Sequence, residues 1–378
     1  MTATLQTNTR RFNAPKGTVN GRQIAFFAAF ILPVYKLLET PSLLARFAKG
    51  DLLFPALLHV LLQTLLLVCL LYIVSTSEKT LFERLEERLG KGVKIVYGLL
   101  AAYFFFSAIL PLLDLEKFVY AVFYDTSPTL FSFAAFFLFC GFACAKGIKT
   151  IARAADLSLF LFLLPFIALL IMSLTEADVT NLLPVFQSEG SRIFSAFDRT
   201  AAHFPDALML LPLIGNLRYE KKDGKKITAG YLSGGAFVLA FLTVFYGVYS
   251  TLAGKEHYAF SKIAQYFPIL SVVGRIDLLL VYMLCIVLFF FVATPLQYGA
   301  IFTAKLFQTK KQTLIAAIVC PIAFVFVLFC NKYYNLLYAL ITGTLSPVFW
   351  TYAAALLLLF LLLCKRKKEE PQTEKARK

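Results

Sequence analysis

Long apolar runs, separated by short polar and basic segments, fill the chain from about residue 23 to residue 364. A membrane-spanning helix needs about 20 apolar residues, and ten runs reach or approach that length. The predicted spans are residues 23–48, 52–74, 95–122, 128–145, 151–174, 191–217, 227–253, 275–306, 313–330 and 338–364. The pattern predicts an all-α integral membrane protein with about ten transmembrane helices, of which the eighth, the longest, is tilted or broken.

Two connections are long enough to hold structure of their own. Residues 78–94 carry apolar side chains at helical spacing, namely Leu81, Phe82, Leu85 and Leu89. This predicts an amphipathic helix at the cytoplasmic interface or on the bundle. Residues 255–273 form either a short outer helix broken at Pro268 or a long structured loop. Residues 1–22 and 365–378 are polar and charged, and we interpret them as cytoplasmic tails of a single transmembrane domain at 23–364.

The sixth predicted span is interrupted in a way that hydrocarbon does not tolerate. Residues 191–217 are apolar enough to cross a bilayer, yet they include ionisable side chains and two prolines: Asp198, Arg199, His203, Pro205, Asp206 and Pro212. Lipid can neither solvate an unpaired charge nor hydrogen-bond to the backbone groups that a helix break exposes. This segment should therefore line a protein interior or a water-filled cavity. The alternative is a plain helix with a proline kink, whose charges reach the interface.

The first predicted span has a matching interruption. Pro33 and Pro41 flank Lys36, Glu39 and Thr40, and a proline cannot donate its backbone amide and clashes with the preceding turn. The first and sixth spans head two halves of five spans each, about 23–174 and 191–364, and enter the membrane from opposite sides. An inverted five-plus-five repeat with broken first and sixth helices predicts this arrangement.

Paired breaks of this kind indicate a binding site for a small solute. Half-helix ends present free amides and carbonyls, which suit a zwitterionic amino acid, or a cation at the carbonyls alone. The candidate ligand-binding residues are Lys36, Glu39, Thr40, Pro41, Thr200, His203, Phe204 and Asp206. All of these except Pro41 and Thr200 are expected to converge on one cavity near mid-membrane. Lys36 and Glu39 could pair with each other, face the ligand or reach the interface. His203 beside Asp206 could relay protons or be structural.

Composition supports a membrane protein and changes the meaning of the positive charge. Of the 378 residues, 59% are hydrophobic and only 16% are charged, against roughly 25% in soluble domains. A net charge of +15 can indicate nucleic-acid binding. With both termini inside, however, the inner segments hold about 27 Lys and Arg residues and the outer segments about eight. This bias predicts that both termini are cytoplasmic.

No pattern in the sequence indicates a metal, a cofactor or a catalytic centre. The seven cysteines lie in or beside apolar runs without a cluster of His or Cys partners, which suits packing rather than zinc or disulfides. The three histidines, His59, His203 and His257, are scattered, and no phosphate-binding loop, HExxH or GxSxG motif occurs. We therefore expect a protein that is not an enzyme and has no cofactor and no metal.

Several short motifs, taken in order, resemble the permease-like B subunit of bacterial spore germinant receptors, the GerAB type. They are Gln23, Pro41 and Asp51 at the start, GIKTIAR at 147–153, ADVTNLLPVFQSEG at 177–190, HFPDALMLLPLI at 203–214 and GRIDLLL at 274–280. The resemblance runs from about Gln23 to Tyr298, and the order and spacing of the motifs are more specific than any one of them.

This resemblance implies an amino acid–polyamine–organocation type fold with a small nutrient germinant, an amino acid or similar molecule, bound near the breaks. It implies an A-type membrane subunit and a C-type lipoprotein as partners in the spore inner membrane, and leaves open a homo-oligomer within that complex. Germinant binding in such complexes triggers germination and ion release, as in a ligand-gated channel. The alternative is a proton- or sodium-coupled amino acid permease, since architecture does not separate the two.

Overall fold

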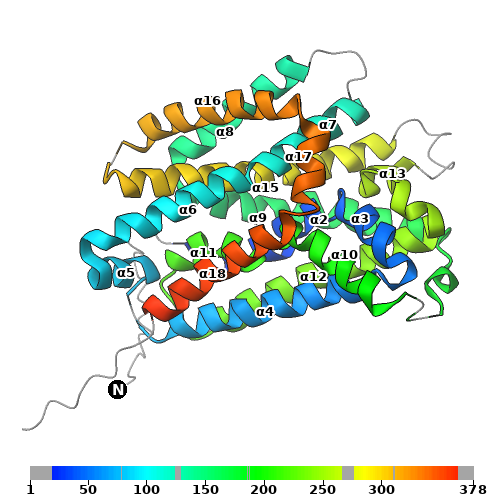
Figure 1. Cartoon of the computed structure of the whole chain (residues 1–378), viewed down its shortest axis with the longest axis horizontal. Helices are drawn as coiled ribbons and strands as arrows, with labels where there is room; N and C mark the ends of the chain where they lie inside the picture. Colours follow the sequence, from blue (N-terminus) through cyan, green and yellow to red (C-terminus); the bar gives the residue numbers. More distant parts are fainter. Residues whose placement is uncertain are drawn as a thin grey trace, which may run out of the picture.

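The computed structural model of the chain describes residues 19–77, 79–123, 129–184, 186, 188–265, 276–309 and 311–364. These residues form a bundle of helices, most of which run along the long axis of the molecule (Figure 1). Within this described part, β-structure is confined to one bridge between Val19 and Leu217. Most of the predicted N-terminal tail, the predicted C-terminal tail and the predicted break at Pro268 lie outside the described residues.

The helices follow the predicted spans closely. The first half contains α1 (Gly21–Phe26), the π-helix η1 (Phe27–Ile31), α2 (Leu32–Lys36), α3 (Thr40–Ala48), η2 (Lys49–Asp51), α4 (Leu53–Ser75), α5 (Leu81–Leu89), η3 (Gly90–Gly92), α6 (Val93–Ser107), α7 (Ile109–Phe123), α8 (Thr129–Lys146), α9 (Ile148–Leu174) and η4 (Val179–Leu182). The second half contains α10 (Gly190–Thr200), η5 (Ala201–His203), α11 (Asp206–Gly215), α12 (Asp223–Tyr249), η6 (Ser250–Lys255), α13 (Ala259–Gln265), α15 (Ile276–Leu306), α16 (Gln312–Asn331), α17 (Tyr334–Ile341) and α18 (Ser346–Cys364). Below, α1, η1, α2 and α3 are the first broken helix, and α10, η5 and α11 are the sixth broken helix.

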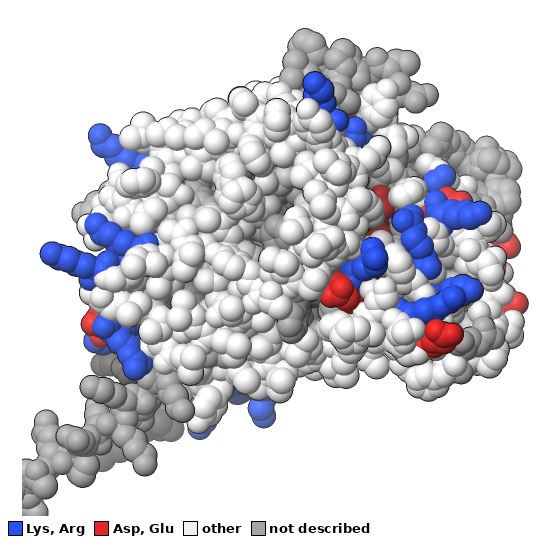
Figure 2. Space-filling view, viewed as in Figure 1, with Lys and Arg blue, Asp and Glu red and all other residues white. Residues whose placement is uncertain are grey.

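The bundle is that of a multi-pass membrane protein. Six helices in the described part are long and apolar enough to cross a membrane: Leu53–Ser75, Leu81–Ala121, Ile148–Leu174, Asp223–Lys255, Leu278–Leu306 and Thr313–Asn331. Two bent pairs pass the same test as single spans, Gly21–Lys36 with Thr40–Asp51 and Tyr334–Ile341 with Ser346–Leu359. Figure 2 shows charged side chains gathered toward the two ends of the long axis, with an almost uncharged band between them. The number of ten spans stays a prediction.

For the eighth predicted span the structure excludes one of the two expected alternatives, and for the tenth it shows a bend that was not expected. The eighth, expected to be tilted or broken, is not broken: α15 is one helix of 31 residues that continues through Pro295, because membrane helices tolerate an interior proline when neighbours take up the freed backbone groups. The tenth is bent by 59° between α17 and α18, a bend that was not predicted, although Gly343 lies in the connection and Pro347 is the second residue of α18.

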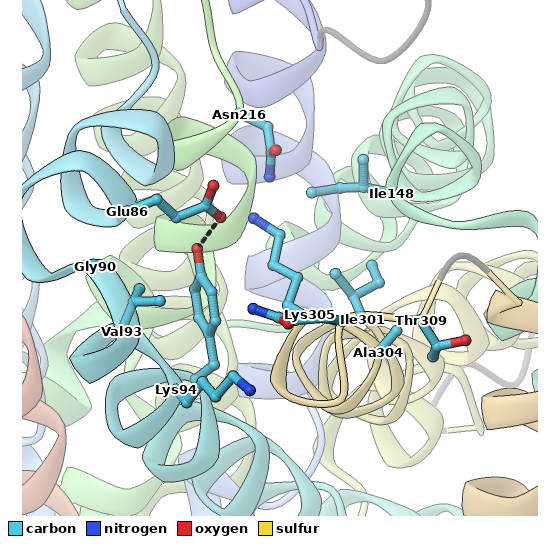
Figure 3. Close-up of a pocket in the computed structure, with 12 residues that line it drawn as sticks. Glu86, Gly90, Val93, Lys94, Ile148, Asn216, Ile301, Ala304, Lys305 and Thr309 are labelled. Atoms are coloured by element: carbon cyan, nitrogen blue, oxygen red, sulfur yellow. Dashed lines mark hydrogen bonds between the residues drawn. The ribbon is translucent and has the colours of Figure 1, made fainter.

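The helix α5 confirms the predicted amphipathic connection. Its N-cap, Thr80, exchanges hydrogen bonds with Glu83: the Glu83 N–H donates to the Thr80 hydroxyl at 3.3 Å, and the Thr80 N–H donates to the Glu83 carboxylate at 2.8 Å. This capping box satisfies two amides at the start of the helix. Leu81, Phe82 and Leu85 are buried against the bundle. The helix lies beside a cavity of about 630 Å³ at its end of the molecule (Figure 3).

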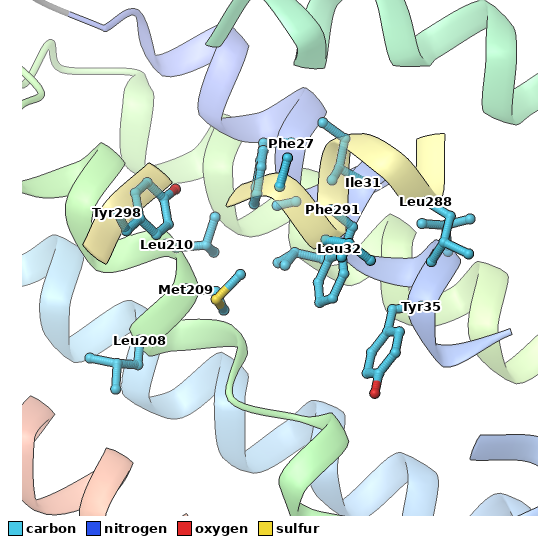
Figure 4. Packing of buried hydrophobic residues seen from close by; sticks show 14 of the residues in the cluster. Phe27, Ile31, Leu32, Tyr35, Leu208, Met209, Leu210, Leu288, Phe291 and Tyr298 are labelled. Atoms are coloured by element: carbon cyan, nitrogen blue, oxygen red, sulfur yellow. The ribbon is translucent and has the colours of Figure 1, made fainter. Parts of the chain in front are cut away.

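Two glycines let α12 approach the first broken helix closely. A Cβ atom placed on Gly234 would lie 2.5 Å from the carbonyl oxygen of Ala28, and one on Gly230 would lie 2.5 Å from that of Ala25. Side chains at these positions would therefore hold the two backbones apart. Buried apolar side chains of the first broken helix, α11 and α15 fill the space beyond (Figure 4), among them Phe27, Leu32, Leu210 and Phe291.

Candidate functional site

The first broken helix opens where the sequence predicts it. α2 ends at Lys36, α3 begins at Thr40, and the two parts are bent by 60°. Pro33 and Pro41 each lie at one of the first two positions of the helix that follows, where the missing N–H has no intrahelical acceptor to lose. Pro41 therefore starts the helix after the break, whereas Pro33 lies where η1 passes directly into α2, before the break.

One side of this break is already occupied by protein. The carbonyl group of Leu38 accepts a hydrogen bond from the backbone N–H of Ala259 at 2.9 Å, and that of Leu37 accepts one from Phe260 at 3.2 Å. Both donors belong to the start of α13. The carbonyls that were expected to be free for a ligand are thus satisfied by a connecting helix.

The sixth broken helix also opens where the sequence predicts it. Phe204 and Pro205 leave helical geometry after η5, and α11 begins at Asp206. Gln63 of α4 accepts a hydrogen bond from the backbone N–H of Ala207 at 3.0 Å. The Asp206 carboxylate lies in the first turn of α11, where the positive end of the helix dipole stabilises a negative charge.

A buried ion pair joins the two breaks. The Lys36 ammonium lies 2.6 Å from the Asp206 carboxylate, and both side chains are at most 4% exposed. The ammonium also donates to the carbonyl of Leu32 at 3.3 Å and lies 5.1 Å from the centre of the Phe204 ring. The second carboxylate oxygen of Asp206 accepts a hydrogen bond from the Tyr231 hydroxyl of α12 at 2.7 Å. Pairing and hydrogen bonding together compensate for taking two charges out of water.

Aromatic and histidine rings surround this pair. The His203 ring stacks on Tyr35 with 5.5 Å between centres, and Phe204 stacks on His59 at 4.3 Å. The Tyr35 hydroxyl donates to the carboxylate of Asp114 in α7 at 2.8 Å. His203 is buried near the backbone carbonyl of Thr200, but among the described residues neither of its ring nitrogens makes a hydrogen bond of good geometry. Since an unpaired buried polar group is costly, these nitrogens are suited to a polar ligand.

Glu39 takes a different partner. Its carboxylate, which is 3% exposed, lies 3.1 Å from Nδ1 of His257, a half-exposed residue between η6 and α13. This hydrogen bond to a carboxylate raises the pKa of His257 above its ordinary value, and burial of the ring opposes the effect. The Glu39–His257 pair therefore faces an end of the bundle, whereas the Lys36–Asp206 pair is enclosed.

The space around the breaks is small. A cavity of about 50 Å³ adjoins both broken helices and is lined by Tyr35, Ala201, Pro205 and Met209, with Phe291 of α15. A further void of about 10 Å³ touches Lys36, Asp206 and Tyr231. Small-molecule sites measure roughly 300–1,000 Å³, so neither of these two cavities is large enough to hold a small molecule.

The structure brings together some of the predicted site residues and separates others. Lys36, Phe204 and Asp206 are in contact, and His203 lies next to them through Tyr35. The Thr200 hydroxyl joins the group through Nε2 of His59 at 3.2 Å. Three predicted residues belong to the other side of the first break: Glu39, Thr40 and Pro41. Lys36 and Glu39 do not pair with each other. Neither of the two charged groups reaches the interface.

Sequence reasoning missed several residues of this centre, among them Asp114, Tyr35 and Tyr231. Asp114 carried a signal, because a carboxylate inside a spanning segment indicates a functional site by default, and Glu116 and Lys117 follow it in the same span. Tyr35 and Tyr231 carried none, since a tyrosine in an apolar run is common in membrane helices. Their roles follow only from the hydrogen bonds that they make to Asp114 and Asp206.

Two helices, broken at matching places and joined by a buried ion pair, define a permease or transporter class of membrane protein. A family model described as spore germination protein, the spore permease family, matches residues 52–335. The chain belongs to this family, which confirms the resemblance found in the sequence. A search of curated proteins finds no match.

Solved structures with the same fold support this class. MhsT, solved in complex with L-phenylalanine, is similar with a TM-score of 0.58 and 15% identity, covering 91% of this chain and 87% of that chain. A mutant manganese transporter of Eremococcus coleocola is similar with a TM-score of 0.56 and 12% identity, covering 91% and 77%. At such identities the likeness shows the fold, and the predicted amino acid–polyamine–organocation, or LeuT-like, architecture is confirmed.

Proposed function

We propose that the protein is the B subunit of a spore germinant receptor and binds a small nutrient, an amino acid or a similar zwitterion, between the two helix breaks. The observation that carries this proposal is the Lys36–Asp206 ion pair, which is buried and joins one break to the other. Family membership supports a role in germination. Because a fold alone does not assign a function, the proposal rests on this site rather than on the fold.

The ion pair is a template for a zwitterion. A ligand carboxylate can replace Asp206 beside Lys36, and a ligand ammonium can replace Lys36 beside Asp206 and the Tyr231 hydroxyl. Every charge then keeps a partner, so the exchange avoids the several kcal/mol that an orphaned buried charge costs. The unpaired nitrogens of His203 supply further polar contacts. Phe204, which lies over the ammonium, favours a cation at the same place.

Ligand entry is coupled to movement in this scheme. The cavity of about 50 Å³ is too small for an amino acid, so binding must separate the first and sixth broken helices. A ligand that binds the separated arrangement better than the closed one shifts the population toward it. This movement is the signal that we propose passes to an A-type membrane subunit and a C-type lipoprotein in the spore inner membrane, with ion release as the outcome.

An amino acid as the ligand has support from one structural neighbour. MhsT is solved with L-phenylalanine on the same fold. The same observation favours a second function, a proton- or sodium-coupled amino acid permease. The two functions are separated by a transport assay, in which steady accumulation of a labelled amino acid in vesicles that contain this chain alone identifies the permease.

Germination profiling tests the proposal. Spores of a strain that lacks this chain are exposed to a panel of single amino acids, nucleosides and sugars. Germination is followed as the loss of spore refractility. The proposal expects loss of the response to one or a few amino acids, restored by the wild-type chain and not by a Lys36→Met/Asp206→Leu double variant that reaches the same protein level. A deletion strain whose only lost response is to sugars would contradict the ligand class.

A further inference from the structure

A second polar cavity lies far from the helix breaks, at the end of the bundle that holds α5. It measures about 630 Å³, within the range of small-molecule sites. Its lining comes from five parts of the chain, with Glu86 from α5, Lys94 from α6, Ile148 from α9, Asn216 just after α11 and Lys305 from α15. The Lys and Arg bias predicts that this end is cytoplasmic.

Lys305 is held in a fixed position in this cavity. Its ammonium lies 4.1 Å from the centre of the Phe82 ring and 5.1 Å from that of Tyr97. Phe82 and Tyr97 are themselves buried, and the Tyr97 hydroxyl donates to Glu86 at 2.6 Å, so neither ring is free to turn away. Aromatic faces stabilise a cation without neutralising it.

The ammonium of Lys305 makes no direct ion pair within the described part of the chain, although the carboxylates of Glu86 and Glu83 are both near enough to attract it. Among the described residues, no carboxylate lies within 4.0 Å of it. The nearest acid of the lining, Glu86, accepts the hydrogen bond from Tyr97 instead, and Figure 3 shows the Lys305 side chain extending toward the space between Glu86 and Asn216. A partly buried cation with an unused charge is costly unless an anion completes it.

The rest of the lining favours an anion as well. Lys94 adds a second ammonium to the lining, where Glu86 is the one carboxylate that the described residues provide, and Glu83 lies near enough to attract Lys305 as well. The Thr309 hydroxyl accepts from the backbone N–H of Lys311, which leaves its own hydrogen free to donate, and Gln308 adds an amide. The lining therefore includes two cations and two neutral donors. Of these, Lys305 extends furthest toward Glu86 and Asn216, while Lys94 and Thr309 lie at other parts of the wall (Figure 3).

We infer that this cavity is a binding site for an oxyanion of the phosphate type, held between Lys305 and Lys94. Oxyanions suit paired ammonium groups, because charge-assisted hydrogen bonds are about twice as strong as neutral ones. The source of the oxyanion is either a free phosphate compound or the headgroup of an anionic lipid that enters from the membrane side. The inference is independent of the germinant site, since no residue of the cavity belongs to the helix breaks.

The test uses the full-length protein, purified in a neutral detergent and titrated with inorganic phosphate against sodium chloride of equal ionic strength. Binding is followed by calorimetry and by the shift in melting temperature. Lys305→Gln should weaken phosphate binding about tenfold, since a hydrogen bond to a charged group is lost. Glu86→Gln should strengthen it about threefold by removing the competing negative charge. A misfolded variant cannot bind more tightly, so the second change keeps the test decisive.

The control and the lipid arm complete the design. Lys255→Gln removes an exposed charge at the opposite end of the bundle and should leave phosphate binding unchanged. The same variants are then placed in phosphatidylcholine nanodiscs with and without phosphatidylglycerol. A Lys305-dependent gain in melting temperature with phosphatidylglycerol alone identifies a headgroup as the source. Equal behaviour of Lys305→Gln and Lys255→Gln in both phosphate and lipid would overturn the inference.

Discussion

Two ion pairs that start three residues apart in the sequence have opposite surroundings. Lys36 pairs with Asp206 and both are enclosed, whereas Glu39 pairs with His257, whose side chain is 53% exposed. The 60° bend between α2 and α3 sends the two side chains in different directions. The comparison teaches that a helix break can divide one charged motif into a buried pair at the centre and a titratable pair at the end of the bundle.

The largest effect should follow from orphaning the central pair. Asp206→Asn leaves the Lys36 ammonium buried without a counterion, and we expect a loss of about 3–5 kcal/mol of stability, read as melting temperature in detergent and as protein level in membranes. The double variant Lys36→Met/Asp206→Leu should recover most of this loss, because no charge is left unpaired.

A surface pair provides the control for this prediction. Lys262 lies 3.5 Å from Glu256, and both side chains are more than a quarter exposed. Lys262→Met should cost less than about 1 kcal/mol. Equal losses at the two pairs would show that the central pair is not desolvated as the structure has it.

A smaller effect should follow from separating α12 from the first broken helix. Gly234→Ala places a methyl group against the carbonyl oxygen of Ala28, and we expect a loss of about 2 kcal/mol from overpacking. A methyl group on Gly141 of α8 would meet open space, with no atom within 4 Å, so Gly141→Ala should instead gain about 0.5–1 kcal/mol from helix propensity. Opposite signs in thermal unfolding confirm the close approach, and equal signs would exclude it.

Next in size is the hydrogen bond that supports the central carboxylate. Tyr231→Phe removes the hydroxyl that donates to Asp206 at 2.7 Å, and we expect a loss of about 1.5 kcal/mol. The exposed Tyr282 of α15 is the control, and Tyr282→Phe should change stability by less than about 0.5 kcal/mol. A Tyr231→Phe variant as stable as the control would remove Tyr231 from the site.

The smallest effect, and the one that depends on pH, belongs to the outer pair. Because the pKa of His257 is raised by Glu39, protonation favours the folded state. The stability from this contact is complete below the ordinary histidine pKa of about 6.5 and is lost as the pH rises through the raised value. The half-exposed ring limits it to less than about 1 kcal/mol.

Melting curves across this pH range check the prediction. The difference in melting temperature between wild type and His257→Ala should be present at pH 5.5 and should vanish by pH 8.5. A difference that grows with pH would mean that His257 is bound as the neutral imidazole.

Much of this architecture could be predicted from the sequence, for identifiable reasons. Prolines beside charges in apolar runs are visible in one dimension, so the breaks before Thr40 and Asp206 were placed correctly. The partner of Lys36 could not be predicted, because it depends on a bend angle. The bend between α17 and α18 has Pro347 at the second residue of α18 but no charge beside it, so the pattern of proline next to charge did not mark it. Long-range partners such as Tyr231 leave no local pattern.

The most direct measurement of the central claim pairs ligand analogues with protein variants. An amino acid selected by germination profiling is compared, by binding to the purified protein, with its decarboxylated amine and its deaminated acid. If the ligand carboxylate takes the place beside Lys36, the decarboxylated amine binds wild type more weakly than the amino acid does, because Lys36 is left without a partner, and it binds Lys36→Met more tightly than wild type. The deaminated acid should in the same way bind Asp206→Asn more tightly than wild type. Analogues that lose the same factor in every variant would show that the ligand does not divide the Lys36–Asp206 pair.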